Sequence, residues 1–288
     1  MLVEFEIWHD CPNKCAFCSL GIYRKITSDD EKISNINKVI EIIKKLDKKY
    51  DEIALIGGEL FTELNENVKN KFIELLNVVI EYNPRKCYIM SSLLNESSLI
   101  KDVIETFKNN KDILMINTSW DKAFRFNEHN YEVWKKNIKF LEDNNIQIHY
   151  ETILTEKMIQ SFLNDDQETL DILLKNVDII RPSDSNGYDN KKLDGFFPKR
   201  SSFIKFLHKL KLFNRRLYDN LFALNQRAST LYIIPLNMRK DRDAESYLED
   251  VDEVPQEKCG HSKIYNCFSD SNGCIICDME AYKEEIDD

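Results

Sequence analysis

The sequence has no long apolar run, no signal segment and no excess of positive charge. No stretch approaches the run of about 18 uncharged apolar residues that a membrane-spanning helix needs, so we predict no membrane span. Residues 1–6 contain neither a basic segment nor a small-residue cleavage site, so they do not resemble a secretory signal. The 40 basic and 50 acidic residues give a net charge of −10, which disfavours nonspecific attraction to phosphate backbones or anionic lipids. These absences predict a cytoplasmic protein for which nucleic acid is not the default partner.

The composition is that of an ordinary globular protein, with 42% hydrophobic and 31% charged residues. Its 288 residues allow two domains or one α/β barrel. Seven of the eight cysteines lie in two clusters at opposite ends of the chain, and in a reducing compartment such clusters indicate metal or iron–sulfur ligands rather than disulfides. The clusters are Cys11, Cys15 and Cys18 near the start and Cys259, Cys267, Cys274 and Cys277 near the end.

Residues 1–182 alternate between strand and helix patterns. Short β-type runs are separated by segments of ten or more residues with apolar residues at helical spacing. Six such units predict right-handed crossovers and a parallel sheet, either a partial barrel or an open doubly wound sheet. The predicted strands cover residues 2–8, 53–56, 87–90, 113–116, 146–152 and 177–180.

Beyond residue 182 the pattern changes to a helical and charged connecting region, residues 183–258, and a cysteine-rich tail, residues 259–288. A loop is followed by an amphipathic helix predicted over 200–224. Its basic residues indicate either a nucleic-acid or leader-peptide surface, or an ordinary packed helix whose basic face pairs with the acidic segment 241–257.

The N-terminal cysteines have the spacing Cys-x3-Cys-x2-Cys directly after the first strand. Three thiolates on one short loop can bind three irons of a 4Fe-4S cube and leave the fourth iron open for chemistry. The alternative is a structural zinc site completed by His9, because such sites need four nitrogen or sulfur ligands.

A Gly-Gly-Glu sequence, Gly57-Gly58-Glu59, follows the second strand. Ligands of parallel sheets lie beyond the carboxyl ends of strands, so this segment and the cysteine loop are predicted to share one pocket. Gly57 and Gly58 are two of only seven glycines, and glycine allows a backbone to approach a ligand closely.

These motifs resemble those of the radical S-adenosylmethionine (SAM) superfamily, including the aromatic Phe17 just before the last cysteine of the loop. The resemblance implies a partial (β/α)6 barrel of class α/β with a small cysteine-rich C-terminal extension. It also implies that Gly57, Gly58 and Glu59 contact the SAM amino group. Leu60 stands where family members often have proline, which is not a ligand.

Further residues resemble the family's SAM-binding positions. Ser119-Trp120-Asp121 and Arg125 look like the Ser-x-Asp and downstream Arg that hold the SAM ribose and carboxylate, and Ser91 and Ser92 are further ribose candidates. The alternative for each is an ordinary cap or turn residue. Cys87, at the far end of its strand, is predicted to be a buried apolar residue rather than a hydrogen donor.

The resemblance also implies a mechanism. Cys11, Cys15 and Cys18 hold a 4Fe-4S cluster whose open iron chelates SAM, and one electron from a donor such as flavodoxin or ferredoxin cleaves SAM to methionine and a 5′-deoxyadenosyl radical. That radical abstracts a substrate hydrogen, and the reaction belongs to either the oxidoreductase or the transferase class.

The C-terminal cysteines have the spacing Cys-x7-Cys-x6-Cys-x2-Cys, and four thiolates close a coordination sphere. They predict either a zinc knuckle or an auxiliary 4Fe-4S cluster. Cys259, Gly273 and Cys277 loosely resemble the start of the SPASM and twitch extensions of peptide-modifying radical SAM enzymes. The glycine-to-cysteine gap is one residue short and the downstream cysteines are missing, which excludes a full two-cluster SPASM domain.

We therefore expect a radical SAM enzyme that modifies a peptide or protein, with a peptide or small molecule as its substrate. Modification of a nucleotide or nucleic-acid base, suggested by the basic helix, is an alternative. A noncatalytic zinc-binding interaction protein is the third interpretation.

Overall fold

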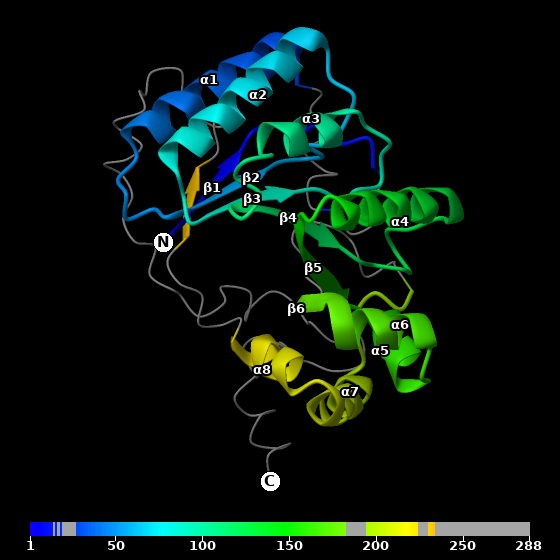
Figure 1. Cartoon of the computed structure of the whole chain (residues 1–288). Helices are drawn as coiled ribbons and strands as arrows, with labels where there is room; N and C mark the ends of the chain where they lie inside the picture. Colours follow the sequence, from blue (N-terminus) through cyan, green and yellow to red (C-terminus); the bar gives the residue numbers. More distant parts are fainter. Residues whose placement is uncertain (14, 16–17, 19–26, 183–193, 224–229, 234–288) are drawn as a thin grey trace.

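The computed structural model describes all residues except 14, 16–17, 19–26, 183–193, 224–229 and 234–288 (Figure 1). It is an α/β structure in which strands and helices alternate from the first residues onward. The strands are β1 (Leu2–Glu6), β2 (Glu52–Ile56), β3 (Lys86–Met90), β4 (Leu114–Ser119), β5 (Gln147–Leu154), β6 (Val177–Pro182) and β7 (Thr230–Ile233).

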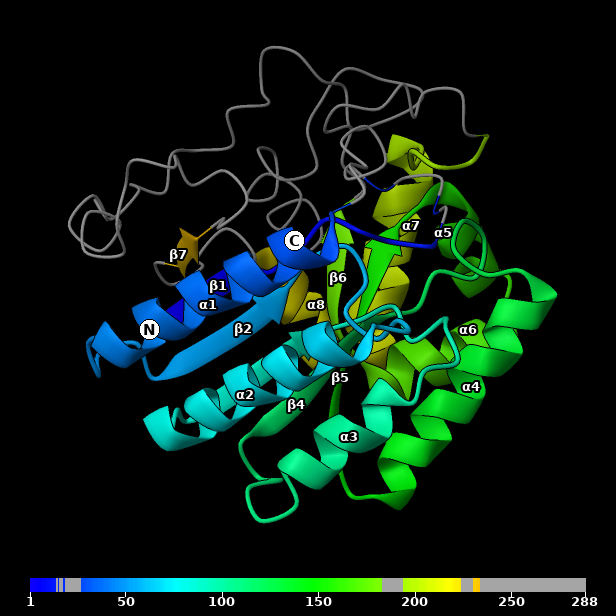
Figure 2. The ribbon, with the colours of Figure 1, turned by 90° about the horizontal axis from the view of Figure 1, so that it is seen from above.

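All seven strands form one parallel sheet in the order β6-β5-β4-β3-β2-β1-β7. Strands β1 to β6 are neighbours in chain order, so each crossover, being right-handed, places its helix on the same face of the sheet. Figures 1 and 2 show α1 to α4 together on this face and the sheet curving away from them. The predicted partial (β/α)6 barrel is confirmed.

Five of the described helices begin at a polar residue whose side chain accepts a hydrogen bond from a backbone N–H of the first turn. Helix α1 starts with a capping box, in which Ser28 accepts from the Glu31 N–H and Glu31 accepts from the Ser28 N–H. No described helix is long and apolar enough to cross a membrane. The helices are α1 (Asp29–Lys45), α2 (Glu66–Tyr82), α3 (Leu99–Thr106), α4 (Glu128–Asp143), α5 (Glu156–Leu163), α6 (Gln167–Asp171), the π-helix η2 (Ile172–Asn176), α7 (Arg200–Phe213) and α8 (Arg215–Ala223).

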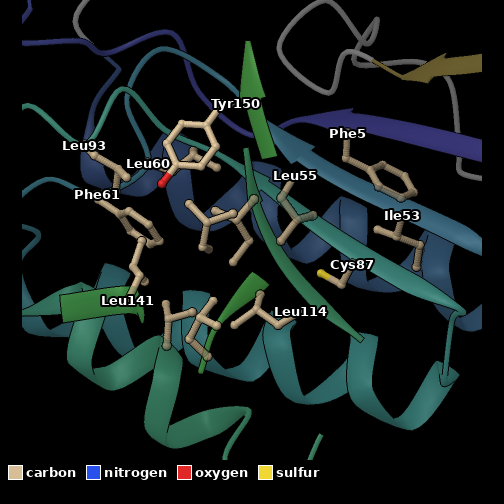
Figure 3. Close-up of a cluster of buried hydrophobic side chains, with 14 of the residues drawn as sticks. Phe5, Ile53, Leu55, Leu60, Phe61, Cys87, Leu93, Leu114, Leu141 and Tyr150 are labelled. Carbon is tan, nitrogen blue, oxygen red and sulfur yellow. The ribbon is translucent and has the colours of Figure 1, made fainter. Parts of the chain in front are cut away.

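The hydrophobic core lies between the sheet and this helical layer. Alternate strand residues form rows across the sheet, one of which runs from Val3 through Ile53 and Cys87 to Leu114, and all four are completely buried. Figure 3 shows Ile53, Cys87 and Leu114 packed together in this layer. Burial raises the pKa of Cys87 to about 12, as expected for an inert core thiol.

The opposite, concave face of the sheet is more polar. Glu4 and Glu6 of β1, Asn117 of β4 and His149 of β5 alternate with the buried row residues and therefore project from this face. This face is the one that helices α1 to α4 do not cover (Figures 1 and 2).

Four details differ from the elements that the sequence predicts. Strand β7 pairs in parallel with β1 and extends the sheet beyond residue 182, although no strand was predicted there. The sequence pattern does not predict helix α5, and it predicts one helix over about 165–175, where the structure has α6 followed by the π-helix.

The single helix predicted over 200–224 is in fact two helices. They are separated at Asn214, whose side-chain amide donates to the backbone oxygens of Leu173 and Leu174 and whose side-chain oxygen accepts from the Leu217 N–H. An asparagine that bonds the backbone in this way caps a new helix rather than continuing the old one.

Candidate functional site

A cavity of about 320 Å³ lies at the carboxyl ends of β1 to β5. It brings together the three N-terminal cysteines, the Gly-Gly-Glu segment, Ser91, Ser92, Ser119 and Arg125. Asp121 of the predicted Ser-x-Asp sequence does not line it but is hydrogen-bonded to Arg125. Phe17 lies outside the described residues. The lining residues are Glu6, Cys11, Asn13, Cys15, Cys18, Ile56, Gly57, Gly58, Glu59, Met90, Ser91, Ser92, Asn117, Thr118, Ser119, Arg125 and Glu151.

The ends of β1 and β2 continue side by side as they enter the cavity. The Gly58 N–H donates to the Trp8 carbonyl at 2.8 Å, and the Glu59 N–H donates to the Asp10 carbonyl at 2.8 Å. The Trp8 indole N–H returns a hydrogen bond to the Glu59 carbonyl at 3.1 Å. The Gly-Gly-Glu segment is therefore hydrogen-bonded to the residues that lead into Cys11.

Close backbone packing requires glycine at both positions of this segment. A Cβ on Gly57 would lie 2.5 Å from the Trp8 carbonyl oxygen, and a Cβ on Gly58 would lie 2.2 Å from that of Asp10. Real Cβ atoms do not approach oxygen this closely, so a side chain would displace the chain before Cys11. The two glycines thus allow the end of β2 to pack closely against the backbone that follows β1, in addition to any close approach to a ligand.

The Glu59 carboxylate is completely buried and accepts several hydrogen bonds. One oxygen accepts from the Phe61 N–H at 3.0 Å and from the Ser91 hydroxyl, and the other accepts from the N–H of Ser92 at 2.8 Å and from its hydroxyl. Asn13, from the cysteine loop, donates to the same oxygen at 3.5 Å and to the Ser92 hydroxyl at 2.8 Å. Glu59 therefore links the ends of three elements: the cysteine loop, β2 and β3.

The three cysteines that line the cavity are half-buried. Burial raises the pKa of Cys11 to about 11, and the nearby negative charges of Glu59, Cys15 and Cys18 act in the same direction. Cys11 therefore stays a neutral thiol near pH 7 unless a cation stabilises its thiolate. Such a group of thiols suits a soft, positively charged metal centre.

The geometry of the donors bears on which centre would fit. Within the described residues, no three His, Cys, Asp or Glu side chains come close enough together to bind one metal ion. A zinc ion needs its ligands around a single point, whereas a 4Fe-4S cube takes each thiolate on a different iron. The alternative zinc ligand, His9, lies with its Nε2 2.5 Å from Oε1 of Glu6. His9 therefore already has an acidic partner within the described part of the chain.

Arg125 connects the β4 side of the cavity to the cysteine loop. Its Nη1 donates to the Cys15 sulfur at 3.7 Å, and its Nε donates to Oδ2 of Asp121 at 3.0 Å. The other Asp121 oxygen accepts from the Ile153 N–H at 2.9 Å. Burial raises the pKa of Asp121, which the Arg125 charge and these hydrogen bonds oppose.

Several lining residues carried no signal in the sequence. Glu6, Asn13, Asn117, Thr118 and Glu151 all line the cavity but belong to no motif that we recognised. The alternation of Glu4 and Glu6 with apolar residues in β1 could have placed Glu6 on the face opposite the core. Nothing in the sequence places Glu151 in the same cavity as Arg125.

The sequence matches no protein-family model and no curated protein. Among solved structures, anSMEcpe with bound AdoMet and the Cp18Cys peptide is 15% identical, with a TM-score of 0.53 over 75% of this chain and 62% of that chain. The complex with the Kp18Cys peptide is 15% identical, with a TM-score of 0.51 over 75% and 62%. Polyhistidine-tagged anSMEcpe with AdoMet is 14% identical, with a TM-score of 0.52 over 75% and 60%.

The chain shares its fold, a partial (β/α)6 barrel, with the anSMEcpe structures. It spans about three fifths of the length of the anSMEcpe chains. The cysteine loop follows β1, the Gly-Gly-Glu segment follows β2 and Ser119 ends β4, and all three line one cavity. Cys259, Cys267, Cys274 and Cys277 lie outside the described residues, as does the acidic segment 241–257.

Proposed function

We propose that this protein is a radical SAM enzyme that modifies a peptide or protein. The observation that carries the proposal is the single cavity in which Cys11, Cys15 and Cys18 meet the Gly-Gly-Glu segment and Arg125, at the carboxyl ends of the strands of a radical SAM fold. Two short motifs far apart in the sequence thus line one cavity at the edge where parallel sheets bind ligands.

The proposed roles follow the layout of the cavity. Cys11, Cys15 and Cys18 would hold a 4Fe-4S cluster, and the Gly57–Glu59 segment would receive the SAM amino group. Phe17, Ser91, Ser119 and Arg125 would contact the rest of SAM. When bound, the cluster and SAM supply reductive cleavage of SAM and a 5′-deoxyadenosyl radical that abstracts a hydrogen. The protein's share is to orient both groups and exclude water.

A peptide is favoured over a nucleotide by the charge of the cavity and by the comparisons. Buried Glu6 and Glu151 line the cavity, and buried carboxylates repel a phosphate. The anSMEcpe structures contain bound peptides.

The basic helix gives the nucleic-acid alternative little support. Lys209 pairs with Asp165 at 2.6 Å, Arg215 pairs with Asp219 at 2.9 Å, and Arg216 donates to the Val177 carbonyl at 3.3 Å. The apolar face of α7 is buried. Of the six Lys and Arg residues of α7 and α8, two are thus paired with acids and a third is bonded to the backbone.

The test is an anaerobic assay with iron and sulfide analysis of the same sample. Protein incubated with SAM and dithionite, which replaces a flavodoxin or ferredoxin donor, should release 5′-deoxyadenosine. We expect about four irons if only the N-terminal cluster forms and about seven or eight if the tail holds a second cluster. Iron-loaded protein that releases none, even with candidate peptides, would contradict the enzymatic function. Zinc without iron would favour a noncatalytic interaction protein.

The C-terminal cysteines are proposed to hold their own metal, zinc or a second 4Fe-4S cluster, within a tail formed by residues 259–288. Replacing Cys11, Cys15 and Cys18 together with Ala should therefore leave metal bound, because four thiolates complete a coordination sphere without help from the barrel. Metal analysis of the anaerobically purified variant checks this. A variant with neither iron nor zinc would show that the tail is no metal site.

Glu59→Gln should weaken SAM binding, because it removes a charge-assisted hydrogen bond worth about 1.5 to 3 kcal/mol. Since about 1.4 kcal/mol corresponds to a tenfold change in affinity, the expected loss is about ten- to a hundredfold. The substitution also replaces an acceptor oxygen by an NH2 group that faces donors from Ser91 and Ser92, so some loss of stability is expected.

The matched control is Trp8→Phe, which removes the buried indole hydrogen bond to the Glu59 carbonyl but leaves the carboxylate and its charge. Titration of SAM and iron analysis of both variants separate the two effects. Unchanged SAM affinity in Glu59→Gln would mean that Glu59 serves only to link the strand ends.

A further inference from the structure

We propose that Arg125 raises the reduction potential of the cluster by donating a hydrogen bond to the sulfur of its ligand Cys15, with Asp121 as a positioning residue for Arg125. This inference rests on the proposed function, because it concerns the cluster that Cys15 would help to hold. It adds a role for Arg125 to the contact with SAM that the sequence resemblance implies.

The geometry places a fixed cation beside one particular cysteine. Arg125 Nη1 lies 3.7 Å from the Cys15 sulfur, within the range of an N–H···S hydrogen bond. The Arg125 side chain is only 13% exposed, so water screens this contact little. Of the cysteines in the described part of the chain, only Cys15 accepts a hydrogen bond from an arginine or lysine side chain.

The second end of the guanidinium is held by a buried acid. Asp121 is 4% exposed in its side chain, binds Arg125 Nε at 3.0 Å and is itself anchored by the Ile153 N–H on β5. Asp121 thus balances part of the cost of burying the guanidinium. It also fixes the fork of Arg125, so that Nη1 points at the loop from the β4 side.

The effect on the potential follows from charge. One-electron reduction adds a negative charge to the cluster, and hydrogen bonds to its sulfurs are among the levers that set cluster potentials. A cation in a poorly solvated site interacts more strongly with the reduced form than with the oxidised form. Removing that cation therefore makes reduction harder.

The experiment is a redox titration of the intact, anaerobically loaded protein without SAM, followed by electron paramagnetic resonance. We expect Arg125→Gln to lower the equilibrium constant for reduction about tenfold, which is a shift of about 59 mV to more negative potential. Arg125→Lys keeps the charge but loses the planar fork, so it should shift less in the same direction.

Lys122→Gln is the matched control, because Lys122 carries the same charge in the same loop. It is 46% exposed and pairs with Glu168 at 2.5 Å rather than with a cysteine. The reduction potential of the cluster in Lys122→Gln should equal that of the wild type. If the tail holds a second cluster, the Cys11/Cys15/Cys18 triple Ala variant shows the signal of that cluster alone. The potential of the tail cluster should be unchanged in both Arg125 variants.

The outcomes separate the inference from the proposed function. Wild-type protein without an iron–sulfur signal would overturn both. A normal wild-type signal together with an unchanged potential in Arg125→Gln would overturn this inference alone. If Arg125→Gln fails to load iron, the potential of Arg125→Lys decides in the same way. Should the potential be unchanged, weaker SAM binding in the same variant would mean that Arg125 serves only SAM.

Discussion

Replacing Cys15 with Ala should reduce 5′-deoxyadenosine formation to background and lower the iron content by about four atoms. Cys15 would supply one of three protein ligands to the cluster, and its sulfur also accepts the hydrogen bond from Arg125. With two thiolates left, the cube loses a corner ligand, and the buried guanidinium faces a methyl group. The measurements are iron analysis and chromatographic detection of 5′-deoxyadenosine.

Cys87→Ala is the control for this experiment. Cys87 lies at the start of β3 in the core layer and is completely buried among Ile53 and Leu114 (Figure 3). Removing its sulfur leaves a small cavity and should cost about 1 kcal/mol of stability. Iron content and activity should match the wild type. A Cys15→Ala protein that keeps both would contradict the assignment of the N-terminal cysteines.

The alternation of strands and helices could be predicted because each unit has its own local signals. Residues Ile36, Ile40 and Ile43 recur at helical spacing behind the Ser28 capping box, and all three are buried as expected. Six units in chain order, joined by right-handed crossovers, leave few arrangements for the sheet.

The elements that were missed depend on tertiary contacts. Strand β7 has only four residues, and it is a strand because β1 has an open edge beside it. The break between α7 and α8 depends on Asn214 reaching backbone oxygens of the π-helix, about 40 residues earlier. A periodic pattern along one segment holds no information on such partners.

The residues of the candidate site also fall into two groups, those with a local signal in the sequence and those that depend on tertiary structure. The cysteines and Gly57-Gly58-Glu59 were proposed from the sequence because the proposed chemistry requires particular residues at fixed spacing. Glu6 and Glu151 were not, because a glutamate in a strand usually faces water. These two are buried in the cavity only because the sheet curves and encloses its concave face.

The sequence could link Gly58 to the site, but it could not show that the backbone before Cys11 packs against this glycine. The sequence favoured close approach to a ligand, whereas the structure places the carbonyl oxygens of His9 and Asp10 within 2.5 Å of a Cβ on Gly58. These carbonyls belong to the backbone that leads into Cys11. The position therefore controls the cysteine loop as well as the ligand.

Gly58→Ala should accordingly cost about 1–3 kcal/mol of stability, as overpacking does, and should abolish loading of the N-terminal cluster. The backbone at Asp10 cannot yield easily, because its carboxylate binds the Thr27 N–H at 2.5 Å and Lys32 Nζ at 2.6 Å. The added methyl group must therefore push the strand ends apart or displace Cys11. Thermal unfolding and iron analysis of the anaerobically reconstituted variant measure the two effects.

The control for Gly58→Ala is Met90→Leu. Met90 lines the same cavity from β3, and the change nearly conserves the volume of the side chain. Such a swap usually costs less than about 1.5 kcal/mol, and iron loading should persist because no backbone atom has to move. Gly57→Ala should resemble Gly58→Ala in a milder form, since its Cβ would meet a single backbone oxygen at 2.5 Å. If Gly58→Ala loads iron normally but binds SAM weakly, the glycine serves the ligand rather than the loop. Normal iron and normal SAM binding together would remove the Gly-Gly-Glu segment from the site.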